Sequence, residues 1–251
     1  MTKKQKKLVV FVTALCAMTS VVPAAHAMHI MEGFLPITFC VLWGVVCVPF
    51  LIIGFFHIQK RLNENRQLIM LLALTGAFVF VISSLKIPSV TGSCSHMTGT
   101  GLGAILFGPC VTSILGIIVL IFQAILLAHG GVTSLGANCF SMAVAGPLLS
   151  FGLYKLLAKS GMNRKVNVFI AAFAGDLFTY CVTSFQLALA HPSPTGGFGY
   201  ALVKYLGVFA PTQVPLAVIE GILTVVIVIG LETYAKEELK GIGFMKGAQN
   251  G

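Results

Sequence analysis

Long apolar runs separated by short basic segments dominate this sequence. Hydrophobic residues make up 57% of the chain and charged residues only 9%, whereas about 25% of the residues in a typical soluble domain are charged. A run of about 20 apolar residues can cross the hydrocarbon core of a bilayer as a helix. The sequence therefore predicts an all-α fold, a polytopic membrane helical bundle.

The first 27 residues have the three parts of a secretory signal peptide. They contain a lysine-rich start, an apolar run that begins at Leu8, and the small-residue end Ala25-His26-Ala27. We predict that residues 1–27 are a cleaved signal peptide and that residues 28–251 form the mature transmembrane metal-binding domain. The alternative is an uncleaved first transmembrane helix, for which the apolar run is short.

Counting the spans leads to about seven transmembrane elements. The obvious apolar runs cover residues 36–57, 67–85, 102–128, 135–157, 166–190 and 212–234. The basic loops at 58–66 and 155–165 should both face the cytoplasm, so an even number of crossings separates them. This condition holds if residues 98–129 form two elements that break near Gly108-Pro109. Irregular backbone at membrane depth is tolerated where it lines a protein cavity.

This topology explains the net charge of +9 without a nucleic-acid partner. The topology places the processed N-terminus, Lys86 and Lys204 outside the cell. It places the C-terminus in the cytoplasm. The basic residues assigned to the cytoplasmic side are Lys60, Arg61, Arg66, Lys155, Lys159, Arg164, Lys165, Lys236, Lys240 and Lys246. The polar segment 86–101 then lies on the same side as Met28 and His29, so His96 can reach them.

Cleavage after Ala27 would create a chelating N-terminus. The Met28 amine, the His29 amide nitrogen and the His29 imidazole can close five- and six-membered rings around one metal ion. His96 is the candidate for a fourth ligand, because its Gly/Ser/Thr-rich segment can fold closely around a buried terminus. Four nitrogens in a plane suit Ni(II), Cu(II) and low-spin Co(II). Taken singly, His29 and His96 are also compatible with ordinary loop histidines.

Other polar residues are less specific. Asp176 and Glu220 fall inside spans, where they either bind a cation in passage or, as we favour, form hydrogen bonds between helices. His129 and His191 are on the predicted outer side and could capture ions. Asn138 could donate a hydrogen bond that supports a ligand.

Two residues near the proposed ligands are left with open roles. Glu32 either neutralises the charge of the metal or caps the first helix. Cys94 is interpreted as structural, although its thiol could bind a soft metal.

Two motifs give the sequence a family resemblance. Residues 28–36 (MHIMEGFLP) and 93–103 (SCSHMTGTGLG) resemble the CbiM family, and residues 130–138 (GGVTSLGAN) are also similar to it. Members of that family are substrate-binding (S) components of energy-coupling-factor cobalt transporters and are related to the NikM nickel components. The resemblance covers essentially all of the mature chain. It implies a bundle of about seven helices and metal ligation by Met28, His29 and His96.

The resemblance also implies partners. The chain has no Gly-x-x-x-x-Gly-Lys-Ser/Thr motif, and the family obtains energy from a pair of cytoplasmic ATPases, a transmembrane coupling (T) protein and a small auxiliary membrane protein. The expected function is Co(II) capture for an ATP-driven importer in a prokaryotic cell membrane, which supplies cobalamin synthesis. We expect that the chain is not an enzyme. We also expect that it binds Co(II) as a transported substrate and binds no cofactor. The alternative within this class is a Ni(II)-specific S component.

Two other classes compete with this interpretation. An intramembrane protease is disfavoured because neither His-Glu-x-x-His nor Gly-x-Ser-x-Gly is present. An autonomous metal permease would need polar residues in several spans, and the sequence offers Asp176 and Glu220. Cobalt rather than nickel rests on overall similarity, because the proposed ligands do not discriminate between the two ions.

Overall fold

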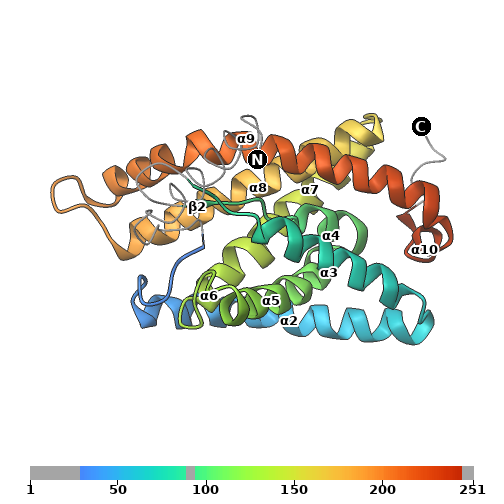
Figure 1. Cartoon of the computed structure of the whole chain (residues 1–251), viewed down its shortest axis with the longest axis horizontal. Helices are drawn as coiled ribbons and strands as arrows, with labels where there is room; N and C mark the ends of the chain where they lie inside the picture. The colour runs from blue at the N-terminus through green and yellow to red at the C-terminus, as the bar shows by residue number, and fades with distance from the viewer. Residues whose placement is uncertain (1–28, 89–93, 245–251) are drawn as a thin grey trace, which may run out of the picture.

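The computed structural model describes residues 29–88 and 94–244, which form an elongated helical bundle (Figure 1). One continuous helical segment joins α6 (Leu135–Asn138), the π-helical η2 (Cys139–Ala145) and α7 (Gly146–Lys159). One two-residue antiparallel ribbon pairs β1 (Ile87–Pro88) with β2 (Cys94–Ser95). The helices are α2 (Ile37–Glu64), α3 (Leu68–Ser84), α4 (Thr100–Phe107), α5 (Pro109–Leu126), α6 (Leu135–Asn138), η2 (Cys139–Ala145), α7 (Gly146–Lys159), α8 (Arg164–Ala190), α9 (Gly197–Tyr234) and α10 (Lys236–Gly241).

The described ranges contain the seven elements that the parity argument predicts. Five helical segments are long and apolar enough to cross a membrane: α2, α5, the continuous α6–η2–α7 segment, α8 and α9. The helix α3 is a shorter apolar helix, and α4 is the short seventh element. The predicted all-α membrane bundle is therefore confirmed.

The predicted break near Gly108-Pro109 separates α4 from α5. Gly108 has a φ of 90°, which suits glycine because it lacks a Cβ, and Pro109 begins α5, where its missing N–H costs no helical hydrogen bond. All eight residues of α4 are buried. The short helix is thus enclosed by protein, whereas Gly108 and Pro109 at the break are half-buried.

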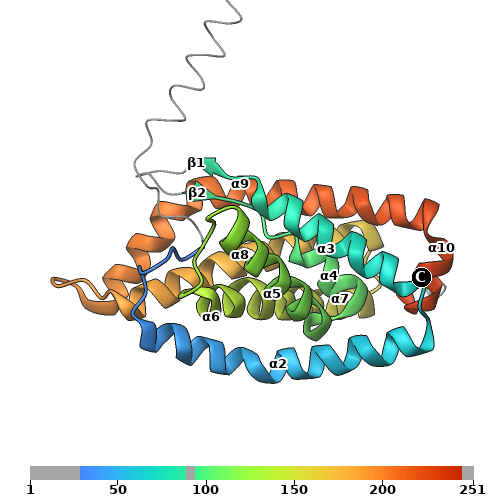
Figure 2. The ribbon, with the colours of Figure 1, turned by 60° about the horizontal axis from the view of Figure 1, so that its bottom comes forward.

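The last span begins much earlier than the sequence indicates. The apolar run predicts residues 212–234, but α9 runs from Gly197 to Tyr234 with Pro211 and Pro215 inside it. Prolines remove helical hydrogen bonds and kink a helix without necessarily ending it. Figure 2 shows the first part of α9 inclined to the remainder.

The helix α2 also extends past its predicted end at residue 57, because polar residues that favour helices continue it to Glu64.

The connecting segments gather at two opposite ends of the bundle. The α2–α3 turn, the α7–α8 turn and α10 lie at the right in Figure 1, where the Arg164 Nη2 donates to the Phe244 carbonyl oxygen at 3.0 Å. The segments before α2 and after α5 lie towards the other end, and the segment after β2 runs from that half of the bundle to α4 in its interior (Figure 1). The loops that carry the basic residues and the segments that carry the histidines therefore lie in different halves of the bundle.

Close helix contacts depend on small residues. Gly54 of α2 lies against the backbone of Cys110 in α5, so that an added Cβ would overlap the Cys110 carbonyl oxygen. Gly136 of α6 approaches Gly44 of α2, with a built Cβ 2.9 Å from the Gly44 Cα. Small residues at such positions let the backbones of membrane helices approach each other.

We expect the substitution Gly54→Ala to lower the free energy of unfolding by about 1–3 kcal/mol, because the added methyl group forces α2 away from α5. Thermal unfolding in detergent measures this change. The matched control is Gly152→Ala in α7, where an added Cβ meets no atom within 4 Å and should be neutral or stabilising by about 1 kcal/mol. Equal midpoints for the two variants would contradict the packing argument.

Candidate metal centre

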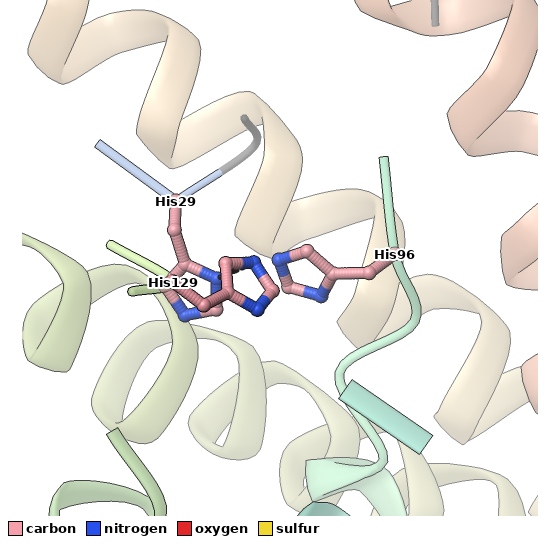
Figure 3. Close-up of side chains that lie close together, drawn as sticks. All are labelled: His29, His96 and His129. Carbon is pink, nitrogen blue, oxygen red and sulfur yellow. Dashed lines mark hydrogen bonds between the residues drawn. The ribbon is translucent and has the colours of Figure 1, made fainter. Parts of the chain in front are cut away.

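Three histidines from three distant segments meet at one end of the bundle (Figure 3). His29 lies in the segment before α2, His96 follows β2, and His129 lies in the loop between α5 and α6. Their side chains are buried, with exposed fractions of 3%, 0% and 2%. One ring nitrogen from each lies within 4.8 Å of the others. Within residues 29–88 and 94–244, this is the one group of three or more histidine, cysteine or acidic residues close enough to hold a metal ion together.

The rings are arranged in contact. His29 and His96 are stacked, with centroids 4.4 Å apart and planes inclined by 14°, and His129 stands nearly perpendicular to His96 at 89°. The His29 Nδ1 and His129 Nε2 atoms are 3.2 Å apart and share a hydrogen bond. Two nitrogens bound about 2.1 Å from one metal ion are at most about 4.2 Å apart. A small inward movement of the rings therefore brings the cluster to coordinating distances.

Each of the three rings presents a nitrogen that has no hydrogen-bond partner among the described residues. These atoms are the Nε2 atoms of His29 and His96 and the Nδ1 of His129. Because the His96 Nδ1 lies 2.9 Å from the Met97 carbonyl oxygen, which can only accept, Nδ1 carries the proton and Nε2 of the neutral ring carries a lone pair. A buried polar atom without a partner in the protein can be satisfied by an ordered water or by a bound ion. The donor set, three imidazole nitrogens, suits a transition-metal ion.

Burial keeps these imidazoles neutral. Desolvation lowers the pKa of His96 to about 4 and that of His129 to about 2. The pKa of His29 lies well below its usual value because of desolvation first and of the neighbouring His96 and His129 second. Neutral imidazole is the form that binds metals, so no proton needs to leave before an ion binds.

The segment that carries His29 is held by the loop before α6 and by α6 itself. The Ile30 N–H donates to the Asn138 Oδ1 at 2.8 Å, and the Asn138 Nδ2 donates to the Ile30 carbonyl oxygen at 3.0 Å. The Ser134 hydroxyl donates to the same carbonyl oxygen. Asn138 therefore fixes the residue next to His29, which agrees with the supporting role expected for it.

Two of the three predicted metal ligands lie together in the structure. The structure brings His29 and His96 together, as the topology argument requires, whereas Met28 lies outside the described residues and so does the side chain of Cys94. His129 belongs to the cluster, although the sequence suggested it only as one of two capture histidines. Its signal is its position directly before the glycine-rich segment 130–138.

His191 and Glu32 lie apart from the three rings. The His191 Nε2 donates to the Phe34 carbonyl oxygen at 2.8 Å, and the ring is exposed. The Glu32 carboxylate accepts from the Thr133 N–H at 3.2 Å, and hydrogen bonds from Thr133 lower its pKa. Glu32 thus ties the segment before α2 to the loop before α6; it does not cap α2, which has no side-chain cap.

Asp176 and Glu220 do more than join two helices. Both carboxylates accept from the backbone N–H of Thr98, at 3.2 Å and 2.6 Å. The favoured interpretation, hydrogen bonding between helices, is therefore incomplete, because the pair binds the loop that carries His96.

Fold and site together define a class: polytopic membrane proteins with a buried, nitrogen-rich site for a transition-metal ion. The profile of the CbiM family, described as "Cobalt uptake substrate-specific transmembrane region", matches residues 29–238. The chain therefore belongs to the CbiM family, a family of membrane components of cobalt uptake, and the family predicted from the two motifs is confirmed.

Similar proteins cover nearly the whole chain. A protein named "Cobalt transport protein CbiM" from Lachnoclostridium phytofermentans is 64% identical over 250 residues, which is 100% of both chains. A protein of the same name from Ruminiclostridium cellulolyticum is 55% identical over 94% of this chain and 95% of its own. A crystal structure of a protein described as a transition metal transporter matches with a TM-score of 0.74 and 26% identity, over 88% of this chain and 100% of that one.

The buried histidines predict an acid-sensitive fold. Their pKa values in the folded state lie below the value of about 6.5 for an unfolded chain. Below pH 6.5 the unfolded state therefore binds more protons, and the free energy of unfolding falls as the pH decreases towards 4. We expect the thermal midpoint of the metal-free protein to fall between pH 7 and pH 5. The thermal midpoint should fall less over this pH range in His129→Gln. An identical fall would show that His129 does not contribute to the acid sensitivity.

Proposed function

We propose that this protein is the substrate-capture subunit of an ATP-driven energy-coupling-factor importer for Co(II). The observation that carries the proposal is the meeting of three buried, neutral imidazoles, with one ring nitrogen of each within 4.8 Å of the others, at one end of a membrane bundle. The His96 Nε2, which would bind the ion, has no hydrogen-bond partner among the described residues. The family description names cobalt uptake, and Co(II) is an ion that nitrogen-rich sites bind well.

The proposed ligand set combines the described histidines with the new N-terminus. Cleavage after Ala27 would free the Met28 amine next to His29, and the six-membered ring of the chelate would close through the His29 Nδ1. In the structure that nitrogen is hydrogen-bonded to the His129 Nε2. Co(II) would replace this hydrogen bond, and the His96 Nε2 would enter from the stacked ring. We place His129 beside the ion, as a third imidazole whose ring packs edge-on against those of His29 and His96.

The orientation follows from charge. The histidine end would face the outside and the end that carries Arg61, Lys155 and Arg164 would face the cytoplasm, since basic residues are retained on the cytoplasmic side. The ion would be captured outside and released inside after a movement driven by partners. We propose as partners a pair of cytoplasmic ATPases, a transmembrane coupling protein and a small auxiliary membrane protein, with cobalamin synthesis as the destination.

Nickel is the second candidate substrate. The same nitrogen donors bind Ni(II) at least as well as Co(II), and the solved relative is described only as a transition metal transporter. Competition between the two ions for the purified protein decides between these substrates. Preference for Ni(II) would keep the site and change the cargo.

We expect His29→Ala and His96→Ala each to abolish high-affinity Co(II) binding in isothermal titration of the purified protein, because each removes a nitrogen from the same ion. His129→Ala should weaken binding by about 10–100-fold, as the loss of a supporting residue does. His57→Ala is the matched control, because His57 is exposed in the part of α2 nearest the basic end. Wild-type affinity in both His29→Ala and His96→Ala would refute the site.

Processing of the N-terminus has its own test. The substitution Ala27→Leu places a large residue at the cleavage position and should leave residues 1–27 attached. The amine would then be an amide, and Co(II) affinity should fall strongly while the thermal midpoint stays unchanged. Intact-mass measurement verifies the processing state of each sample. Equal affinity of the cleaved and uncleaved proteins would exclude the N-terminal chelate but not the histidine cluster.

A further inference from the structure

Two carboxylates lie behind the loop that carries His96. Asp176 of α8 and Glu220 of α9 have exposed fractions of 1% and 0%, and their carboxyl groups lie against each other. Buried charged groups are costly in a membrane protein and mark a function more often than simple packing. The pair is not part of the histidine cluster, so the proposed metal site does not by itself explain why these two residues are acidic.

The donors around the pair come mainly from the His96 loop. The Thr98 N–H reaches both carboxylates, and the Thr98 hydroxyl donates to the Glu220 Oε1 at 3.0 Å. Gln213 of α9 donates through its Nε2 to the Asp176 Oδ2 at 2.8 Å and to the His96 carbonyl oxygen at 3.1 Å. The carboxylates are therefore linked to His96 on both sides, through Gln213 and through Thr98.

One peptide group connects the carboxylates to the imidazole. The Thr98 N–H and the Met97 carbonyl belong to the same planar unit, and in a trans peptide they point in opposite directions. The N–H faces Asp176 and Glu220, and the carbonyl oxygen accepts from the His96 Nδ1 at 2.9 Å. Fixing the N–H thus fixes the carbonyl, which in turn fixes the imidazole ring with its proton on Nδ1.

Charge strengthens this connection. A hydrogen bond to an ionised acceptor is about twice as strong as a neutral one, and hydrogen bonds in a chain polarise one another. Negative charge on the pair therefore makes the Met97 carbonyl a stronger acceptor. A metal-binding histidine whose other nitrogen donates to a strong acceptor is better oriented and more basic.

A cation site at the pair itself fits the geometry less well. The oxygens of Asp176 and Glu220 already accept from a backbone N–H, a hydroxyl and an amide. Those donors would have to leave before an ion could bind. The arrangement instead suits carboxylates that hold donor groups in place.

We infer that Asp176 and Glu220 are positioning residues that orient His96, and select its Nδ1–H tautomer, through the Met97–Thr98 peptide group. This inference rests on the proposed function, in which the His96 Nε2 binds Co(II). Asp176 and Glu220 would thus support the metal site that contains His96. The Met97–Thr98 peptide group and the Gln213 side chain connect the two acidic residues to it.

The variants Glu220→Gln and Asp176→Asn each replace one acidic group of the pair by an amide of the same shape. The matched control is Glu232→Gln in the same helix α9, because Glu232 pairs with Arg164 at the basic end. For the purified full-length protein, we expect Co(II) affinity to fall by about 10–100-fold in the first two variants and not in the control. The visible d–d absorption of the bound Co(II) at saturation should also change in the first two variants, because the orientation of one ligand changes.

A metal-free measurement separates this inference from the proposed function. In ¹⁵N-histidine NMR of the apo protein in detergent, the signal assigned by its loss in His96→Gln should show the Nδ1–H tautomer. In Glu220→Gln and Asp176→Asn the signal should shift towards the other tautomer. If that shift occurs but the wild type binds no Co(II), the proposed function fails and the positioning role stands.

Several outcomes would overturn the inference. Unchanged His96 signals in both variants, or unchanged affinity and absorption in both, would reduce the pair to a structural contact between helices. A second Co(II) equivalent that is lost in both variants would make the pair a cation site instead. If one charge variant fails to fold, the other decides alone, and unchanged His96 signals in that variant overturn the inference. Gln213→Met removes the second link, between Asp176 and the His96 carbonyl oxygen, and leaves the Thr98 hydrogen bonds in place. The His96 tautomer should therefore stay Nδ1–H in this variant, and loss of that tautomer would overturn the route through the peptide group.

Discussion

At the end of the bundle that carries the histidines, buried backbone groups must form hydrogen bonds within the protein. The Ile30 backbone bonds to Asn138, the Thr98 backbone bonds to Asp176 and Glu220, and both sets of hydrogen bonds are buried. An unpaired backbone group in such surroundings costs a few kcal/mol. These two anchors hold irregular segments inside the protein, and each lies within two residues of a clustered histidine.

The helices serve this arrangement by bringing distant segments close together. Small residues such as Gly54 and Gly136 let α2 lie directly on α5 and α6, and the fully buried α4 follows the His96 loop into the interior. Once the loops are anchored, the polar nitrogens of the three rings have few partners besides each other. The same packing therefore produces both the low pKa values of the histidines and their readiness to bind a metal ion.

Much of this architecture can be predicted from the order of residues alone. Hydropathy and the distribution of basic residues predict seven elements, the break near Gly108-Pro109, and a common side for His29 and His96. His129 was not assigned as a ligand, because its one signal, a position directly before the glycine-rich segment 130–138, does not specify metal binding. The early start of α9 escapes such reasoning because two prolines and a glycine-rich beginning are as typical of a loop as of a kinked membrane helix.

The sequence by itself determined that the chain is a membrane bundle and predicted a common side for His29 and His96, because hydrophobic length and positive charge act locally along the chain. Its motifs at residues 28–36 and 93–103 indicated the CbiM family by resemblance. Only the tertiary structure decided which polar groups meet. Asp176 and Glu220, which contact one peptide group beside His96, lie 78 and 122 residues away from Thr98 in the chain. Such contacts depend on the crossing of helices in three dimensions, which no local pattern of residues records.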